Sequence, residues 1–156
     1  IRAWLNGDFL TAAFNDDESA DILVTEVDNS AASTGFADND NVSENTNDKI
    51  FLPSRAEMTS TAYNFLKDDG PDRFRERSVS DYARATGAYA HPEKSADSTQ
   101  DYYGNGWWWL RSPIDWLDNV ACAVHVNGIV RYGSADYVSL AYIGVVPALR
   151  VHSSAI

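Results

Sequence analysis

Residues 107–132 read WWWLRSPIDWLDNVACAVHVNGIVRY, and this stretch predicts the centre of the fold. Three runs, at 107–111, 120–126 and 129–132, are rich in the aromatic and β-branched residues that strands prefer. Asn127-Gly128 separates the last two runs. This dipeptide is a strong signal for a tight hairpin, because both turn positions then adopt positive φ. We therefore expect a compact antiparallel sheet in the last third of the chain.

Weaker signals lie on both sides of this sheet. Apolar spacing, capping residues and glycines predict three short helices and two further strands. The helices are expected at 1–13 with a break near Gly7, at 54–66 behind the capping box Ser54–Glu57, and at 80–85 before Gly87; the strands are expected at 49–52 and 144–151. Helices first and a sheet last predict an α+β fold, with short helices packed on a small antiparallel sheet and long loops. The length of 156 residues suits one domain, 1–156.

The charge is concentrated in one segment. The net charge is −11, and ten acidic residues with no Lys or Arg lie between Asn15 and Asp48. We expect this segment to form solvated loops, with one strand at 22–25. The net charge disfavours duplex nucleic acid and anionic membranes as partners, and no apolar run approaches the ~20 residues that a membrane-inserted helix needs. Because the chain enters an amphipathic pattern directly at Ile1, we expect its N-terminal part to be missing.

The residues that could carry chemistry are few. Cys122 is the only cysteine, and His91, His125 and His152 lack the spacing of zinc ligands. The run Asp38-Asn39-Asp40-Asn41 lacks the turn Gly and the late Glu of a helix–loop–helix calcium site, so we interpret it as a surface loop. We predict no metal, no cofactor and no catalytic residue.

The aromatic residues divide along the chain. All six Phe lie at or before Phe74, whereas every aromatic from Asp101 onward is Tyr or Trp, the residues that also build binding surfaces. On a strand, Trp107 and Trp109 share one face and Trp108 takes the other. We expect this run to lie in the core. Arg111 follows it, and we expect its guanidinium to bind loop carbonyls or an acidic side chain.

Trp116 has a different setting, in a loop between Asp115 and Leu117. No alternation buries it, so we expect an exposed Trp of the kind that dominates binding interfaces. We also expect Tyr137 and Tyr142 to be exposed near Trp116, because binding residues collect on loops of a rigid scaffold.

Six segments, in order along nearly the whole chain, carry a resemblance to a known family. They are IRAWLN (1–6), KIFLPS (49–54), DYARA (81–85), WWWLRSP (107–113), VNGIV (126–130) and GVVPAL (144–149). Together they resemble a family of bacterial and phage domains of unknown function, which is similar to the C-type-lectin fold of the formylglycine-generating-enzyme subtype. Members of that family have strands before the segment that matches Ile1.

Some such domains are similar to the variable proteins of diversity-generating retroelements, in which a reverse transcriptase rewrites a C-terminal stretch. This resemblance implies that 114–143 is a variable region that binds a protein or cell-surface partner, on a virion or a cell. The implied ligand-binding residues are Ile114, Asp115, Trp116, Leu117, Asp118, Asn119, His125, Arg131, Tyr132, Asp136, Tyr137, Ser139, Leu140, Ala141 and Tyr142.

Two other interpretations remain open. A non-diversified domain of the same fold would act as a structural or adhesion module. An enzyme is disfavoured, because the namesake of the fold uses a pair of cysteines and Cys122 is single, among Ala and Val. Calcium-dependent sugar binding is also disfavoured, since the last third has few acids and no Glu-Pro-Asn type of motif. The ligand and the oligomeric state are left open.

Overall fold

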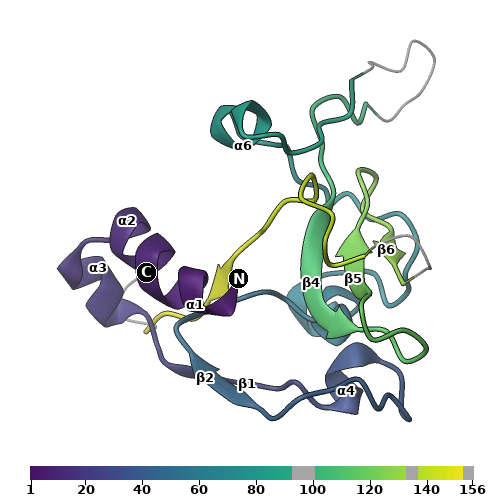
Figure 1. Ribbon diagram of the computed structural model, residues 1–156, viewed down its shortest axis with the longest axis horizontal. Helices are drawn as coiled ribbons and strands as arrows, with labels where there is room; N and C mark the ends of the chain where they lie inside the picture. The colour runs from purple at the N-terminus through teal and green to yellow at the C-terminus, as the bar shows by residue number, and fades with distance from the viewer. Residues whose placement is uncertain (93–100, 133–136, 153–156) are drawn as a thin grey trace.

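The computed structural model describes residues 1–92, 101–132 and 137–152, and it has an α+β architecture of short elements. Figure 1 shows the three-stranded sheet β4-β5-β6 on one side of the molecule and the N-terminal helices on the other. In chain order the elements are α1 (Arg2–Trp4), the π-helix η1 (Leu5–Phe9), α2 (Leu10–Ala13), α3 (Asp16–Asp21), β1 (Thr25–Val27), α4 (Ala31–Thr34), β2 (Thr46–Asp48), β3 (Ile50–Phe51), α5 (Arg55–Met58), the 3₁₀ helix η2 (Thr61–Tyr63), α6 (Asp81–Ala85), β4 (Trp108–Pro113), β5 (Ala121–Val124), β6 (Val130–Arg131) and β7 (Ala148–Leu149).

The central sheet forms where the sequence predicts it. β4 pairs antiparallel with β5, and β5 pairs antiparallel with β6. The hairpin between β5 and β6 is confirmed, but its predicted turn type is wrong, because only Gly128 has positive φ (75°). The Gly128 N–H donates to the His125 carbonyl at 2.9 Å, and the His125 N–H donates to the Ile129 carbonyl at 2.8 Å. This pattern belongs to a three-residue loop that ends in a left-handed glycine.

The two faces of β4 build two clusters of core residues. Trp108 (2% exposed) and Leu110 join one cluster, with Val124 and Val130. Trp109 (6% exposed) faces the other way and joins the second cluster, against which Trp107 packs. The predicted alternation is confirmed, and Trp108 and Trp109 lie in the core as expected, whereas Trp107 precedes β4 and is only half-buried against the second cluster.

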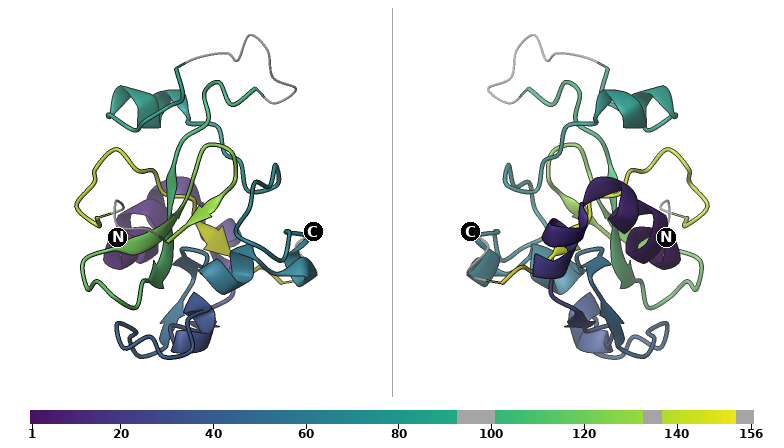
Figure 2. Two further views of the ribbon diagram at one scale, coloured as in Figure 1. Left: turned by 90° about the vertical axis from the view of Figure 1, so that its right-hand side faces the viewer. Right: turned by 90° about the vertical axis from the view of Figure 1, so that its left-hand side faces the viewer.

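Two smaller sheets lie beside the central one. β1 pairs with β2, and β3 pairs with β7, both antiparallel. The strand predicted at 144–151 is therefore present only as two residues, while Gly144 bridges to Trp108 on the edge of the central sheet. The views in Figure 2 show the yellow β7 segment leaving the green sheet to reach the earlier part of the chain.

The first helix differs from its prediction in two ways. Residues 2–13 stay helical through Gly7, which lies inside the π-helical turn rather than at a break. Its apolar side is largely open, since only Leu5 is buried and Trp4 is 46% exposed. Trp4 and Phe9 pack on each other instead, with ring centroids 5.1 Å apart.

Capping chemistry explains the other helices. The Ser54–Glu57 capping box is confirmed, but α5 ends at Met58, because Ser60 caps a new 3₁₀ turn and Asn64 turns the chain with positive φ. α6 forms as predicted behind Ser80, and Gly87 follows it with φ 100°. In Figures 1 and 2, α6 stands apart from the sheets.

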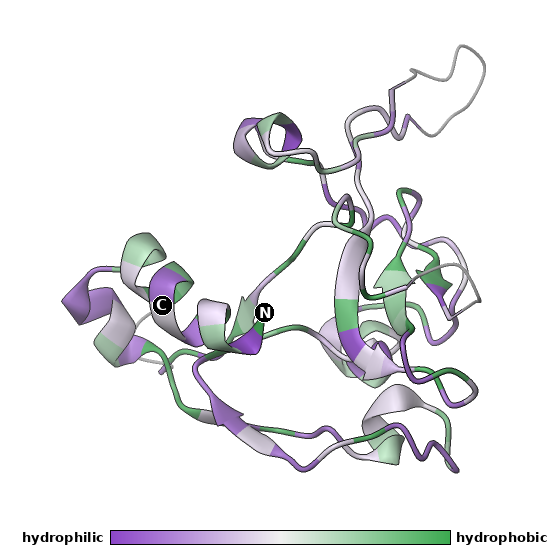
Figure 3. Ribbon diagram, in the orientation of Figure 1, coloured by the Kyte–Doolittle hydropathy of each residue, from purple (hydrophilic) through white to green (hydrophobic). Residues whose placement is uncertain are grey.

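The acidic segment is more ordered than predicted. A second capping box, Asn15–Glu18, opens α3, and the expected strand at 22–25 is displaced to β1, which pairs with β2. In Figure 3, α3 is coloured mainly as hydrophilic, whereas β5 is coloured as hydrophobic. In the described part of the chain, no helix has the length and apolarity needed to cross a membrane.

Candidate functional site

The loop between β4 and β5 stands on a fixed base. Ile114 is fully buried and Val120 is 2% exposed, and these two residues close the loop through a backbone hydrogen bond of 3.4 Å. Asn39 Nδ2 donates to the Pro113 carbonyl at 3.0 Å, and Asn41 Nδ2 donates to the Ile114 carbonyl at 2.8 Å. Residues 115–119 therefore project from a base that the core and the 36–44 loop hold in place.

A group of four side chains, here called the aromatic surface, lies at this loop: Phe36, Arg55, Trp116 and Tyr132. The ring of Phe36 meets Trp116 edge-on at 5.9 Å and Tyr132 edge-on at 5.6 Å. Trp116 is 52% exposed and Tyr132 is 40% exposed, whereas Phe36 also packs on the core. Edge-on aromatic packing of this kind fixes ring orientation without burying the rings.

The Arg55 side chain packs on two of these rings and is held by hydrogen bonds. Its guanidinium carbon lies 4.8 Å from the centroid of Phe36 and 5.1 Å from that of Tyr132. Asp69 accepts from both Nε and Nη2 of Arg55, and the Thr34 carbonyl accepts from Nη1. Gly35 permits this approach, because a Cβ at that position would lie 2.1 Å from Arg55 Nη1. The guanidinium thus forms a two-bond ion pair with Asp69 and lies over the rings of Phe36 and Tyr132.

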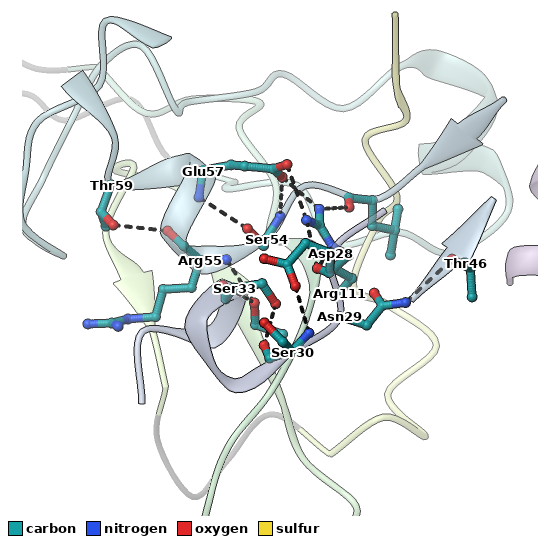
Figure 4. A network of polar contacts seen from close by, with 12 residues as sticks. Asp28, Asn29, Ser30, Ser33, Thr46, Ser54, Arg55, Glu57, Thr59 and Arg111 are labelled. Carbon is teal, nitrogen blue, oxygen red and sulfur yellow. Dashed lines mark hydrogen bonds and ion pairs between the residues drawn. The ribbon is translucent and has the colours of Figure 1, made fainter. Parts of the chain in front are cut away.

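A polar network fixes the strand that carries the loop (Figure 4). Arg111 Nη1 and Nη2 donate to the two carboxylate oxygens of Glu57 at 2.6 and 3.1 Å, and further bonds reach the carbonyls of Leu52 and Asp28. Hydrogen bonds from Ser30 lower the pKa of the Asp28 carboxyl below its ordinary value. The prediction that Arg111 binds carbonyls and an acidic side chain is confirmed, so β4 is tied to α5 and to the end of β1.

A second aromatic group surrounds Trp107. Its ring lies 4.4 Å from that of His125, and it meets Tyr89 and Tyr142 edge-on at 6.2 and 6.4 Å. The Arg131 guanidinium lies 5.7 Å from the Trp107 centroid. Tyr142 is exposed, as predicted, but its described ring contact is with Trp107 rather than with Trp116.

Exposure divides the predicted ligand-binding residues into two sets. The exposed ones are Asp115, Trp116, Asp118, Asn119, Tyr132, Tyr137, Ser139, Ala141 and Tyr142. The prediction is wrong for Ile114. Its side chain is fully buried at the base of the loop, so a ligand at the surface cannot contact it. Leu117 and Leu140 are half-buried against the two core clusters, and His125 and Arg131 are half-buried beside Trp107. Asp136 lies outside the described residues.

Tyr137 lies next to the loop of Trp116. It pairs with Val120 in an isolated bridge, and the Val138 N–H donates to the Asn119 carbonyl at 3.0 Å. If residues 136–143 formed an ordinary strand with one buried face, Val138 would be expected to lie on that face. It is instead 61% exposed. The exposed part of 137–142 therefore extends the surface around residues 115–119.

The charge distribution differs from the one expected along the chain. The acidic segment and the Trp- and Tyr-rich end are far apart in sequence, yet Asn39 and Asn41 fasten the acidic loop directly to residues 113 and 114. Asp38 and Asp40 flank Asn39, and Asp115 and Asp118 flank the Trp116 loop, and all four are exposed. Exposed carboxylates are therefore carried on both of the loops that meet where Phe36 contacts Trp116.

The structure also shows how the potential metal ligands and the thiol are arranged. Within 1–92, 101–132 and 137–152, no group of three or more His, Cys, Asp or Glu side chains is arranged to hold a metal ion. Cys122 is fully buried in the first core cluster. The Asn side chains of the 38–41 run bind backbone carbonyls, which agrees with its interpretation as a surface loop.

Phe36 and Arg55 belong to the site but were missed by the sequence reasoning. Phe36 lies in the acidic segment that the sequence predicts to form solvated loops, and Arg55 lies inside the helix predicted at 54–66. No pattern in the sequence marks their approach to Trp116 and Tyr132, which lie at least 60 residues further along the chain.

Comparison with known proteins gives one match. No curated protein and no solved structure matches the chain. Residues 1–153 match a family described as a domain of unknown function (DUF6273). Because this match spans nearly the full length, the chain belongs to the DUF6273 family of domains.

Proposed function

We propose that this chain is a ligand-binding display domain with a C-type-lectin fold, which binds a protein or cell-surface partner through the exposed residues of 114–143. The observation that carries the proposal is Trp116, which is 52% exposed on a loop whose base residue, Ile114, is fully buried. An exposed Trp on a rigid base is the arrangement that dominates the free energy of many protein interfaces.

Preorganisation supports a binding role. Phe36 orients both Trp116 and Tyr132 edge-on, so little side-chain entropy remains to be lost when a partner docks. Tyr137 adds a further exposed aromatic beside the same loop. Binding is favoured over catalysis, because the thiol of Cys122 is fully buried and out of reach of a substrate.

The division of 114–143 supports the comparison with diversified lectin-fold proteins. The resemblance implies a fixed framework, which consists of Val120, Val126, Gly128, Val130, Gly133, Val138 and Gly144. Of its valines, Val120, Val126 and Val130 are at most 4% exposed, whereas Val138 is 61% exposed and does not fit a buried framework. The residues between them include the exposed set. A surface can vary without loss of folding only where its residues lie outside the core. We place such a domain on a virion or a cell surface.

The flanking DNA tests diversification. The proposal predicts a neighbouring reverse-transcriptase gene and a near-copy of the 3′ end of this gene, with substitutions confined to codons that carry adenine in the copy. A neighbourhood that contains neither element would favour the second candidate, a non-diversified adhesion domain that uses the same exposed surface.

A further inference from the structure

We infer that the aromatic surface binds a basic segment of a partner protein, with an Arg or Lys side chain against Trp116 and its charge among the surrounding carboxylates. This inference rests on the proposed binding function and names the chemistry of the partner. Trp116 supplies the ring, because its side chain is 52% exposed and an indole is the side chain that attracts a cation most strongly.

The carboxylates come from two loops that are fastened together. Asp115 and Asp118 lie on either side of Trp116 in the sequence. Asp38 and Asp40 flank Asn39, whose side chain is only 3% exposed and donates to the Pro113 carbonyl at 3.0 Å. The contact between Phe36 and Trp116 brings the same two loops together a second time. Figure 1 shows the chain after α4 beside the loop that follows β4.

These four carboxylates differ from the paired acids Asp48, Asp69, Asp72 and Glu57. Among the described residues, Asp38, Asp40, Asp115 and Asp118 have no ion pair within 4.0 Å. Arg55, the basic member of the surface, is paired with Asp69 at 2.6 Å and is mostly buried. The two loops that meet at Trp116 therefore carry four exposed carboxylates without an ion pair among the described residues.

This combination selects a basic partner over an acidic or neutral one. An acidic segment that docked on Trp116 would be repelled by the exposed carboxylates of the same two loops, since charges interact over a Debye length of about 8 Å at physiological salt. A neutral apolar segment would gain contact with Trp116. It would also remove water from the neighbouring carboxylates without supplying a hydrogen bond or an opposite charge in its place. Arg and Lys instead pack an aliphatic stem on the ring and place a charge among the acids.

A random peptide library tests the chemistry of the partner. The library is selected on the wild-type domain and counter-selected on Trp116→Ala, so that only peptides that need this ring are kept. The inference predicts enrichment of Arg and Lys in these peptides. Enrichment of acidic or neutral peptides would overturn the basic partner while leaving Trp116 as a binding residue. Failure to obtain any Trp116-dependent peptide would overturn the inference, and the flanking DNA would still test diversification.

A matched pair of variants tests the role of the carboxylates. For a selected basic peptide, Asp115→Asn with Asp118→Asn is expected to weaken binding about tenfold. Asp17→Asn with Asp21→Asn removes the same charge from α3, at the opposite end of the long axis of the molecule, and is expected to weaken binding less than about twofold (Figure 1). Equal losses of affinity in the two variants would mean that only the net charge of the domain affects binding. That result would contradict a basic segment bound beside Asp115 and Asp118.

Discussion

Gly128 shows how one residue links two parts of the chain. It has φ 75°, and a Cβ at this position would lie 1.9 Å from the Asp72 carbonyl oxygen. Asp72 and Arg75 are paired and almost fully buried, with Nε of Arg75 3.2 Å from the carboxylate. Burial alone would raise the pKa of Asp72, but hydrogen bonds from the backbone N–H groups of Leu66 and Phe74, together with Arg75, hold it below its ordinary value. The hairpin thus packs on a buried charged turn.

Gly128→Ala is expected to lower the free energy of unfolding by about 3 kcal/mol, because a left-handed alanine is strained and its methyl group must displace the backbone of Asp72. Gly7→Ala is the control. Gly7 lies in a helix with nothing within 4 Å of an added Cβ, so this variant is expected to gain about 0.5–1 kcal/mol. Urea unfolding measures both, and an unchanged Gly128→Ala would contradict the packing described for the turn.

At the scale of elements, local signals predicted more than distant ones. The Ser54 capping box, the helix at Ser80 and the alternation of Trp107, Trp108 and Trp109 depend on neighbours within a few residues, and all three are confirmed. The end of α5 was wrong because the competing cap at Ser60 was not recognised. The pairing of β3 with β7 joins residues nearly 100 positions apart, and no local pattern specifies it.

The connection between β4 and α5 depends on the forked guanidinium of Arg111. Arg111→Lys is expected to lower the free energy of unfolding by about 2 kcal/mol, because an ammonium group cannot reach both Glu57 oxygens and the Leu52 and Asp28 carbonyls together.

Arg73→Lys is the matched control, since Arg73 is exposed and its guanidinium lies 5.3 Å from the ring centroid of Phe74. Its expected cost is below about 0.5 kcal/mol. Thermal and urea unfolding of the two variants compare them directly, and equal costs would show that the network in Figure 4 adds nothing to stability.

At the scale of the whole molecule, the acidic and the aromatic regions meet in space. Sequence alone assigned the charge to one end of the chain and the candidate binding residues to the other. Their meeting depends on Asn39 and Asn41, whose amide groups bind carbonyls 74 and 73 residues away. Trp116 and Tyr132 could be predicted because they lie in the stretch around the central sheet, whereas Phe36 and Arg55 reach the site only through long-range packing.

The central claim is that the exposed aromatic residues form a binding surface that contributes much less to folding than the core does. Its most direct test is the free energy of unfolding of a triple variant, Trp116→Ala with Tyr137→Ala and Tyr142→Ala, compared with Trp108→Ala. The triple variant loses two edge-on ring contacts and is expected to cost about 2 kcal/mol. Trp108→Ala opens a cavity in the core and is expected to cost about 4 kcal/mol on its own. A triple variant that costs as much as Trp108→Ala would place these residues in the core and contradict the account.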